Sequence, residues 1–537
     1  MGGSSSGFQT PFLETSNLQN FLLITTLSLL LLKSLQLFFR KRSLHKKFGE
    51  REENIENIEK AYKSIPEPRR FPLIGNWLMI FQINKRDHLK KAIELGIKYG
   101  PYFRITLFNE EIIILNSPES VKALLMSGNI EHAHRGTLME KLWHKEMEGM
   151  IIYPGGEKWK ARRKLLNRPF TYKSLQLHNP CFHKHSERMV KQLEKRFQVG
   201  SGGEQVIGVV DDILKQSTFG ISSETLMGAD LEKLEEGSMF CENLDVLIEC
   251  AFMRVLRPWL LIPWIWRRSS FFKKTSNAIQ AMGKVTFNII KKYEEKAQLA
   301  PSEDSDLSDT MIQVMLQNGV DPQLVFSEIL ITLGVGNETT PVSAEHALFM
   351  LATHQEHQER CREEVDSIFD NPLMSKNGIL EFDALKEMKY LERCIQESLR
   401  IHPVAMSMRR LEAPLRINEE LVLPKGVSVL VAPFILHNQP KYFPNPEKYD
   451  PDRFLPDQIR ERHPYAYVPF SAGMRSCIGM KLAMLELKVI LATILRNFEV
   501  HTPDKIEDVE FTVNSTIKTI NPIRFSLTRR HRSSNTD

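Results

Sequence analysis

A single cysteine, Cys477, stands in a loop whose composition suits a thiolate bound to a metal. The run FSAGMRSCIG at 470–479 places a glycine on each side of it, and glycine lets the backbone approach a metal closely. Arg475 can hold a carboxylate and lower the pKa of a nearby thiol. Backbone N–H groups at the start of a following helix can donate to the sulfur, and the helix dipole stabilises its charge. One such cysteine could be structural, but the full pattern FxxGxRxCxG is highly specific.

Glu397 and Arg400 are three residues apart, so on a helix their side chains share one face and can form an ion pair. This spacing alone is weak evidence, because chance matches and surface ion pairs are common. It gains weight from Arg453 in the run PDRF at 451–454, which offers a second arginine before the cysteine loop. The three residues are therefore candidates for one charge cluster.

The run GNETTP at 336–341 lies within an apolar stretch that predicts a long helix over 322–355. Glu338 beside the hydroxyl of Thr339, in apolar surroundings, could relay protons. Pro341 cannot donate to the carbonyl four residues earlier, so the helix should kink or open there. A groove that holds an acid and a hydroxyl is expected. The alternative is that the run caps the start of a helix.

A basic run, WKARRK at 159–164, predicts a short helix. Trp159 and Arg163 are four residues apart and can point the same way, while Lys160 and Lys164 form another line. Taken alone, such a run is more often a solvated basic helix than a site.

The N-terminal segment at about 18–39 is strongly apolar and long enough to span a bilayer as a helix. Basic residues follow it directly, at positions 40–47, and only Glu14 carries charge before it. Positive charge stays on the cytoplasmic side, so we expect a retained anchor with the rest of the chain facing the cytosol. A cleaved signal peptide would carry its basic residues before the apolar run.

The rest of the sequence indicates a fold that is mainly α with a minor β lobe. Strands are expected at 102–107, at 111–115 and around 411–431, and helices over most of the remainder. The expected organisation is an anchor with its basic flank at 1–45, a charged then proline-rich linker at 46–75, a catalytic domain at 76–527 and a polar tail at 528–537. The segment 254–272 mixes tryptophan with arginine, which is typical of a membrane interface, although a buried core segment is equally compatible.

Composition excludes several classes of protein. The chain has 537 residues and a formal net charge of +5, which does not indicate a nucleic-acid binder. Its six cysteines are too few for a disulfide scaffold in a chain this long. No two of them have the close spacing of a zinc knuckle or a redox dithiol.

Together and in this order, these runs resemble the cytochrome P450 superfamily over about 66–525, most closely its family-4 branch over 438–500. The resemblance implies the cytochrome P450 fold and a haem b cofactor with Cys477 as axial ligand of the iron. The implied site residues are Trp159, Arg163 and Arg475 on the haem propionates, Glu397, Arg400 and Arg453 in a structural cluster behind the haem, and Glu338 and Thr339 in proton delivery. The acid is Glu rather than the commoner Asp, which keeps the same charge.

The resemblance also bears on how the haem is held. In many family-4 enzymes a glutamate immediately before the glycine of the Gly-x-acid-Thr run forms an ester with a haem methyl group. Here that residue is Val335, which has no carboxylate, so a non-covalent haem is expected. Glu338 lies about 60° around the helix and about 4.5 Å further along, and is not expected to substitute.

By the same resemblance, the enzyme would insert one atom of O2 into C–H bonds of apolar substrates such as fatty acids, terpenoids, hormones or xenobiotics. Electrons would come from NADPH through NADPH–cytochrome P450 reductase, with cytochrome b5 as a second candidate partner, on the endoplasmic reticulum membrane. Lys160 and Lys164, off the haem face, would help dock the acidic reductase. The alternatives are a haem-thiolate isomerase or dehydratase that needs no external electrons, and a haem protein without catalysis. Retention of Glu338 and Thr339 argues against both.

Overall fold

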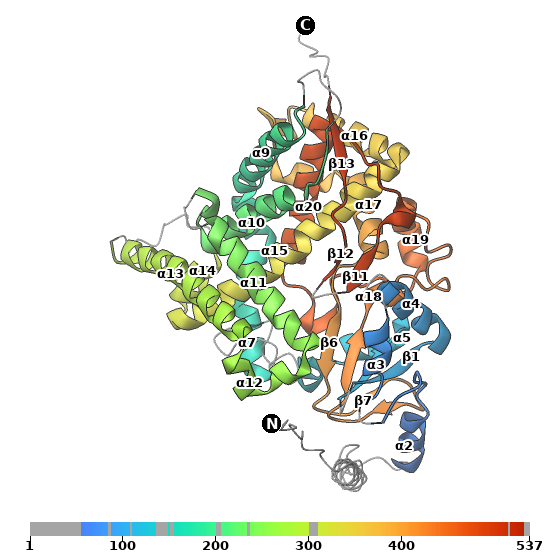
Figure 1. The fold of residues 1–537 in the computed structure, drawn as a ribbon. Coiled ribbons are helices and arrows are strands. Elements are labelled where there is room, and N and C mark those ends of the chain that lie inside the picture. The colour runs from blue at the N-terminus through green and yellow to red at the C-terminus, as the bar shows by residue number, and fades with distance from the viewer. Residues whose placement is uncertain are drawn as a thin grey trace, which may run out of the picture.

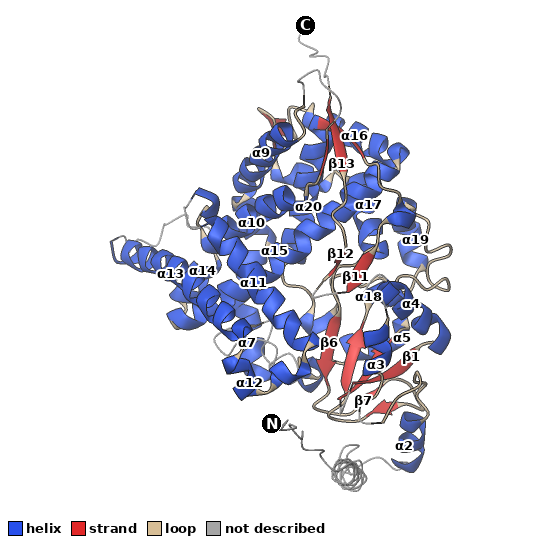
Figure 2. Ribbon diagram, in the orientation of Figure 1, coloured by secondary structure: helices blue, strands red, loops and turns tan. Residues whose placement is uncertain are grey.

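A computed structural model describes residues 55–72, 74–83, 87–107, 110–135, 149–150, 155–199, 206–233, 237–299, 310–513 and 516–530. Helices make up most of these residues, and the strands gather along one side of the molecule (Figure 2). The helices are α2 (Ile55–Lys63), α3 (Trp77–Gln82), α4 (His88–Tyr99), α5 (Pro118–Leu125), α7 (Gly156–Leu166), α8 (Tyr172–Leu177), α9 (Asn179–Arg196), α10 (Asp211–Met227), α11 (Gly237–Leu256), α12 (Pro263–Arg268), α13 (Ser270–Leu299), α14 (Met311–Gln317), α15 (Pro322–Thr353), α16 (Gln355–Phe369), α17 (Lys389–Ile401), α18 (Pro433–Leu436), α19 (Pro456–Glu461) and α20 (Met480–Asn497). The expectation of a mainly helical chain with a minor β part is confirmed.

The long helix α15 runs through the centre of the helical part, where it packs against α10, α11, α17 and α20 (Figure 1). Its start is fixed by Asp321, whose side chain accepts the backbone N–H of Gln323, and by proline at the first helical position. The helix continues through Pro341 to Thr353, so the alternative in which the run at 336–341 caps a helix start is wrong. Apolar residues lie on nearly every side of this 32-residue helix. This pattern suits its position, because other helices cover it on several faces.

The main sheet contains four strands in the order β1 (Tyr102–Leu107), β2 (Glu110–Leu115), β9 (Ser428–Val431) and β6 (Ser407–Arg410). β2 pairs antiparallel with β1 and parallel with β9, and Ile113 faces Val429. Ile113 and Leu115 pack into one core cluster and Ile114 into another, because alternate side chains of a strand point to opposite faces. The hairpin predicted at 102–107 and 111–115 is therefore confirmed.

Short strands complete the β part. They are β3 (Ile207–Gly208), β4 (Ser375–Lys376), β5 (Ile379–Leu380), β7 (Leu415–Arg416), β8 (Val422–Leu423), β10 (Phe498–His501), β11 (Phe511–Val513), β12 (Ile517–Thr519) and β13 (Phe525–Arg529). β11 and β12 form an antiparallel hairpin, and β13 pairs with β10 and β3. Strands thus do occur within 411–431, where the sequence predicted them.

The segment expected to be a linker is folded from Ile55 onward. Helix α2 places Ile58 and Tyr62 in a core cluster with the β2 and β9 side chains, and Ile65 joins them. The Tyr62 hydroxyl donates to Glu111 at 2.6 Å, which ties α2 to strand β2 of the main sheet. The spacing of the apolar residues at 58, 62 and 65 could have indicated an amphipathic helix, but the charged residues around them concealed this pattern.

The expected boundaries near the two ends of the chain compare differently with the structure. The expected tail begins at residue 528, but Thr528 and Arg529 belong to β13, where they pair with Glu499 and Phe498. The expected anchor at 1–45 lies outside the described residues. Within the described ranges, no helix combines the length and apolar character that crossing a membrane requires.

The aromatic segment 254–272 divides between the two interpretations. Trp266 is buried in a small core cluster, with the Arg254 guanidinium 4.3 Å from its ring centre. Trp259 and Trp264 are 53% and 61% exposed. The segment therefore has one side packed in the core and another side with exposed tryptophans. Composition alone could not show which aromatic residues are buried.

Candidate metal centre

The loop that carries Cys477 is shaped by close approach of its backbone to helix α5. Gly473 has φ of 68°, and a Cβ atom there would lie 1.8 Å from the carbonyl oxygen of Leu125, so no other residue fits. Ser471 also has a positive φ, of 58°, which is uncommon outside glycine. The Cys477 N–H donates to the Phe470 carbonyl at 2.9 Å and closes the loop. The chain then enters α20, so the cysteine stands just before a helix N-terminus.

The Cys477 thiol is accessible and at the same time enclosed. Its side chain is exposed, yet protein atoms surround it closely enough for desolvation to raise its pKa. Both observations hold if the sulfur faces a recess rather than the outer surface. The Gly479 backbone N–H and the charges of Arg163 and Arg135 oppose the rise in pKa. The contribution of a backbone N–H was expected from the sequence. The cations that lower the pKa of Cys477 are Arg163 and Arg135, whereas the sequence suggested Arg475.

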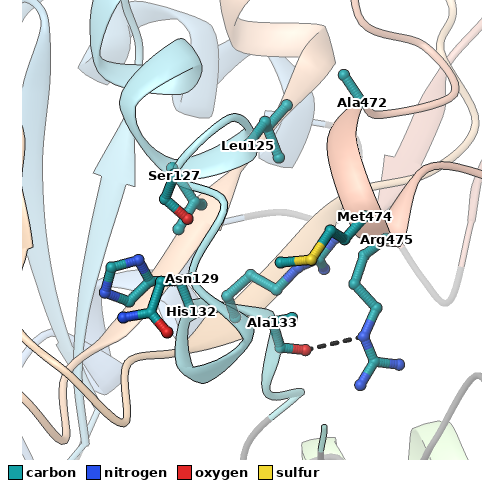
Figure 3. A pocket seen from close by; sticks show the side chains of 10 residues that line it. Leu125, Ser127, Asn129, His132, Ala133, Ala472, Met474 and Arg475 are labelled. Atoms are coloured by element: carbon teal, nitrogen blue, oxygen red, sulfur yellow. Dashed lines mark hydrogen bonds between the residues drawn. The ribbon is translucent and has the colours of Figure 1, made fainter. Parts of the chain in front are cut away.

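Trp159 and Arg475 meet directly. The Arg475 guanidinium lies 4.1 Å from the Trp159 ring centre, and its Nε and Nη1 donate to the carbonyls of Ala133 at 2.8 Å and Met150 at 3.0 Å. Figure 3 shows Arg475 beside a small hollow, reaching toward Ala133. Trp159 is 2% exposed, and its indole Nε1 is buried with no hydrogen-bond partner in the described structure. The family resemblance assigned both residues to one site, and they lie in contact.

Two more arginines join this group, and sequence reasoning missed them. Arg135 follows the short 3-10 helix Ile130–Ala133, and Arg409 lies on β6. Burial and then repulsion by Arg135 and Arg163 lower the pKa of Arg475 to about 8. Burial lowers the pKa of Arg135 to about 10. Burial also holds the pKa of Arg409 well below its usual range. Neither Arg135 nor Arg409 lies in a motif that indicates a site, so no local pattern could have signalled their convergence.

This arginine–tryptophan group, which we define as Trp159, Arg135, Arg163, Arg409 and Arg475, has donors left over. Arg135 Nε and Arg409 Nη2 are buried without acceptors, like Trp159 Nε1. No carboxylate within the described ranges pairs with Arg135, Arg163 or Arg409. Arginine stays protonated in proteins, so the lowered pKa values express the cost of burying cations without an anion. A ligand with two carboxylates, as haem has, fits these donors, and the nearby thiol fits its iron.

Glu397, Arg400 and Arg453 form the cluster that their sequence pattern suggested. Glu397 and Arg400 are fully buried and make a bidentate pair, with Nε–Oε2 of 2.7 Å and Nη2–Oε1 of 2.9 Å. Arg453 Nε lies 3.3 Å from Glu397 Oε1, and the Asp450 N–H donates to the same oxygen at 3.0 Å. Burial raises the pKa of Glu397, and the Arg400 hydrogen bonds oppose it.

Remaining donors of Arg400 hold a long loop in place. Its Nη1 donates to the His437 carbonyl at 3.2 Å and its Nη2 to the Pro446 carbonyl at 2.7 Å. The cluster therefore fastens helix α17 to the chain that leads into the cysteine loop. Such a buried pair is costly to break from one side, because the other charge is left without a partner.

The acid and hydroxyl on α15 are neighbours that point to different partners. Thr339 Oγ1 donates to the Val335 carbonyl at 3.1 Å, within the helix. Glu338 Oε1 accepts from Thr516 Oγ1 at 3.2 Å and lies 3.9 Å from Lys518 Nζ, both on or beside the β11–β12 hairpin. The hairpin contact was not expected from sequence. Val335 is exposed and Thr339 partly exposed in the middle of a helix that is mostly buried, so this stripe of α15 is accessible.

The basic helix α7 divides as expected. Trp159 is buried and Arg163 partly buried, whereas Lys160 and Lys164 are exposed. Lys160 lies 3.8 Å from Glu157, and both side chains are well exposed. The lysine line is therefore on the solvent side of the helix that contributes to the arginine–tryptophan group.

Comparison with known proteins decides the family. A sequence model described as cytochrome P450 matches residues 65–527. The chain is 28% identical to Cytochrome P450 4c21 of Blattella germanica over 499 residues, which cover 90% of this chain and 96% of that protein. It is also 28% identical to Cytochrome P450 4g1 of Drosophila melanogaster, over 87% of this chain and 89% of that one. The chain belongs to the cytochrome P450 family. The resemblance to its family-4 branch is confirmed by the same relatives.

Membership of the cytochrome P450 family establishes the class of enzyme. The protein is a haem-thiolate monooxygenase, an oxidoreductase that uses O2, apolar substrates and a redox partner. Its cofactor is haem b, bound non-covalently through a cysteine thiolate. The sequence of the chain agrees, since Val335 cannot form the ester found in other family-4 enzymes.

Proposed function

We propose that Cys477 is the axial thiolate and that the arginine–tryptophan group holds the haem propionates. The supporting observation is the set of buried donors without acceptors, on Trp159, Arg135 and Arg409, in the neighbourhood of one enclosed thiol. Bound haem supplies thiolate-ligated iron, which favours cleavage of the O–O bond. The residues of the chain bind and orient that group, and Gly479 N–H steadies the sulfur.

Glu338 and Thr339 are the proposed proton-handling pair. The Thr339 hydroxyl lies on the accessible stripe of α15, where it can exchange its intrahelical hydrogen bond for one to a ligand or water. Glu338 is held by Thr516 near the partly exposed Lys518, so its carboxylate can be resupplied with protons from the solvent side. Glu397, Arg400 and Arg453 act structurally, by fastening the loop before Cys477.

The electron donor, the substrate class and the location in the cell are also proposals. We propose NADPH–cytochrome P450 reductase as the electron donor, cytochrome b5 as a possible second one, and an apolar substrate such as a fatty acid, terpenoid or xenobiotic. The apolar segment at 18–39 supports single-pass anchoring in the endoplasmic reticulum, with the catalytic domain at 76–527 in the cytosol.

A ligand-shift screen of the purified ferric enzyme, followed by product analysis, tests this function. Apolar compounds that displace water from the iron should shift the Soret band saturably. The best of them should yield a product with one added oxygen atom that depends on NADPH, reductase and O2. Turnover without NADPH would instead support a haem-thiolate isomerase or dehydratase. Substrate binding with no turnover under any electron supply would support a haem protein without catalysis.

A further inference from the structure

A buried acid on α15, Glu328, has no part in the site described so far. It lies eight residues before Gly336, about 12 Å along the helix axis. Its side chain is 1% exposed, and burial raises its pKa to about 7, against the opposing effects of the Met150 N–H and Arg162. A carboxyl this deeply buried is costly unless its surroundings use it.

Glu328 contacts the residue that holds Arg475. The Met150 N–H donates to Glu328 Oε2 at 2.8 Å, and the Met150 carbonyl accepts from Arg475 Nη1 at 3.0 Å. The same residue is thus fixed on one side by the acid and holds the arginine on the other. Arg475 in turn lies over the Trp159 ring.

The neighbouring glycine shows how tightly this segment is pressed against α15. A Cβ atom on Gly149 would lie 2.7 Å from Ile331 Cδ1 and 3.1 Å from Glu328 Oε2. A side chain at 149 would therefore require Ile331 to shift and would crowd the Glu328 carboxylate that accepts from Met150.

Glu328 also faces the helix that carries Trp159 and Arg163. Arg162 Nε, on α7, lies 3.8 Å from Glu328 Oε1, and this side chain is mostly buried. Glu328 Oε1 and Arg162 Nη1 are both buried without a hydrogen-bond partner within the described structure, so the charge contact between them is not saturated. One carboxylate thus reaches both supports of the arginine–tryptophan group.

We propose that Glu328 is a positioning residue for haem binding, which aligns Arg475 through Met150 and steadies α7 through Arg162. The inference rests on the proposed role of Arg475 at the propionates. Without the carboxylate, the Met150 N–H is buried with no acceptor, and the segment moves away from α15. Arg475 then loses its fixed carbonyl, and the propionates lose an aligned donor.

Transfer of haem from the purified ferric holoprotein to apomyoglobin measures this directly, without substrate turnover. Glu328→Leu should lose haem about tenfold faster than wild type, because a buried group is left unsatisfied. Glu328→Gln keeps an oxygen for Met150 but loses the charge toward Arg162, and should fall between the two. Should Glu328→Leu fail to fold, Glu328→Gln alone still decides, since haem loss at the wild-type rate would overturn the proposal.

Glu345 provides a matched control on the same helix. It is also buried, and burial raises its pKa to about 8, but its backbone partner is Ile523, away from Met150 and Arg475. Glu345→Leu should lower the melting temperature without a comparable change in the rate of haem loss. Equal acceleration in both leucine variants would show a general packing effect and refute the positioning role.

A double variant with Arg475→Lys distinguishes the positioning role of Glu328 from the proposed role of Arg475 at the haem propionates. If Glu328 acts on Arg475 through Met150, Glu328→Leu, which removes the acceptor for Met150, should accelerate haem loss less in the Arg475→Lys variant than in wild type. Fully additive rates would contradict the inference. Haem loss unchanged in Arg475→Lys itself would instead show that the proposed role of Arg475 is wrong.

Discussion

The Arg475 guanidinium lies 4.1 Å from the centre of the Trp159 ring, and the two residues come from opposite halves of the chain. The contact joins the cysteine loop to helix α7 and aligns a cation with an indole N–H that has no acceptor in the described structure. Cations attract the face of an aromatic ring, most strongly that of tryptophan. The contact therefore places the loop that carries Cys477 beside the residues that we propose hold the haem propionates.

Replacement of Trp159 by phenylalanine tests the indole N–H separately from the ring. Trp159→Phe should still provide a face for Arg475 but should lower the ratio of haem to protein after purification, because one donor is gone. Trp159→Ala should also destabilise the fold, by about 3–5 kcal/mol, through the cavity it leaves. Full haem content in Trp159→Phe, measured by pyridine haemochrome, would contradict a role for the N–H.

Replacement of Thr339 by alanine tests oxygen activation. Thr339→Ala should keep its haem, since the hydroxyl donates to the Val335 carbonyl within the helix and not to any of the proposed haem-binding residues in the described structure. It should direct NADPH electrons to hydrogen peroxide at the expense of product, because protons are no longer delivered in order. Thr339→Ser, which retains a hydroxyl, is the control and should stay close to wild type. Unchanged coupling of NADPH to product in the alanine variant would refute the assignment.

Charge reversal at Lys160 and Lys164 tests reductase docking. Charges at the rim of an interface act mainly on association rate and salt dependence, so the double glutamate variant should slow reduction, most clearly at low salt. Lys191 and Lys195 on α9 are also exposed and four residues apart, which makes their reversal a matched control. If both double variants behaved like wild type at every salt concentration, the docking role would be wrong.

Extraction of the haem tests the reading of the residue before Gly336. Acidified organic solvent should remove unmodified iron protoporphyrin IX, because Val335 offers no carboxylate. A Val335→Glu variant places an acid on the accessible stripe of α15 and serves as the positive comparison, since part of its haem should resist extraction. Haem that stays with the wild-type polypeptide after denaturation would show that another residue tethers it.

Local features were predictable from sequence, whereas convergent ones were not. Glu397 and Arg400 are one helical turn apart, so their pairing follows from periodicity alone. Arg135 and Arg409 reach the site only because β6 pairs with β9 and the chain after α5 folds over the cysteine loop. Neither has a sequence neighbour that marks it. The same holds for Thr516, whose contact with Glu338 depends on how the β11–β12 hairpin packs.

Two errors have a common physical cause. The segment at 46–75 reads as a linker because charges surround the apolar residues of α2, and β13 continues into the expected tail because backbone pairing with β10 does not require apolar side chains. Tertiary contacts override composition in both places. The central helix α15 was easier to predict, since its 32 residues are mostly apolar around the helix, which is typical of a buried helix.

The most direct test of the account is the spectrum of the ferrous protein with carbon monoxide. Wild type should show the red-shifted Soret band that marks thiolate ligation, and Cys477→His should lose it. Cys241 is the control, because it is also partly accessible but lies on α11, so Cys241→Ser should keep the band. If Cys477→His retained the thiolate band, Cys477 would not be the ligand, and the proposed site would be wrong.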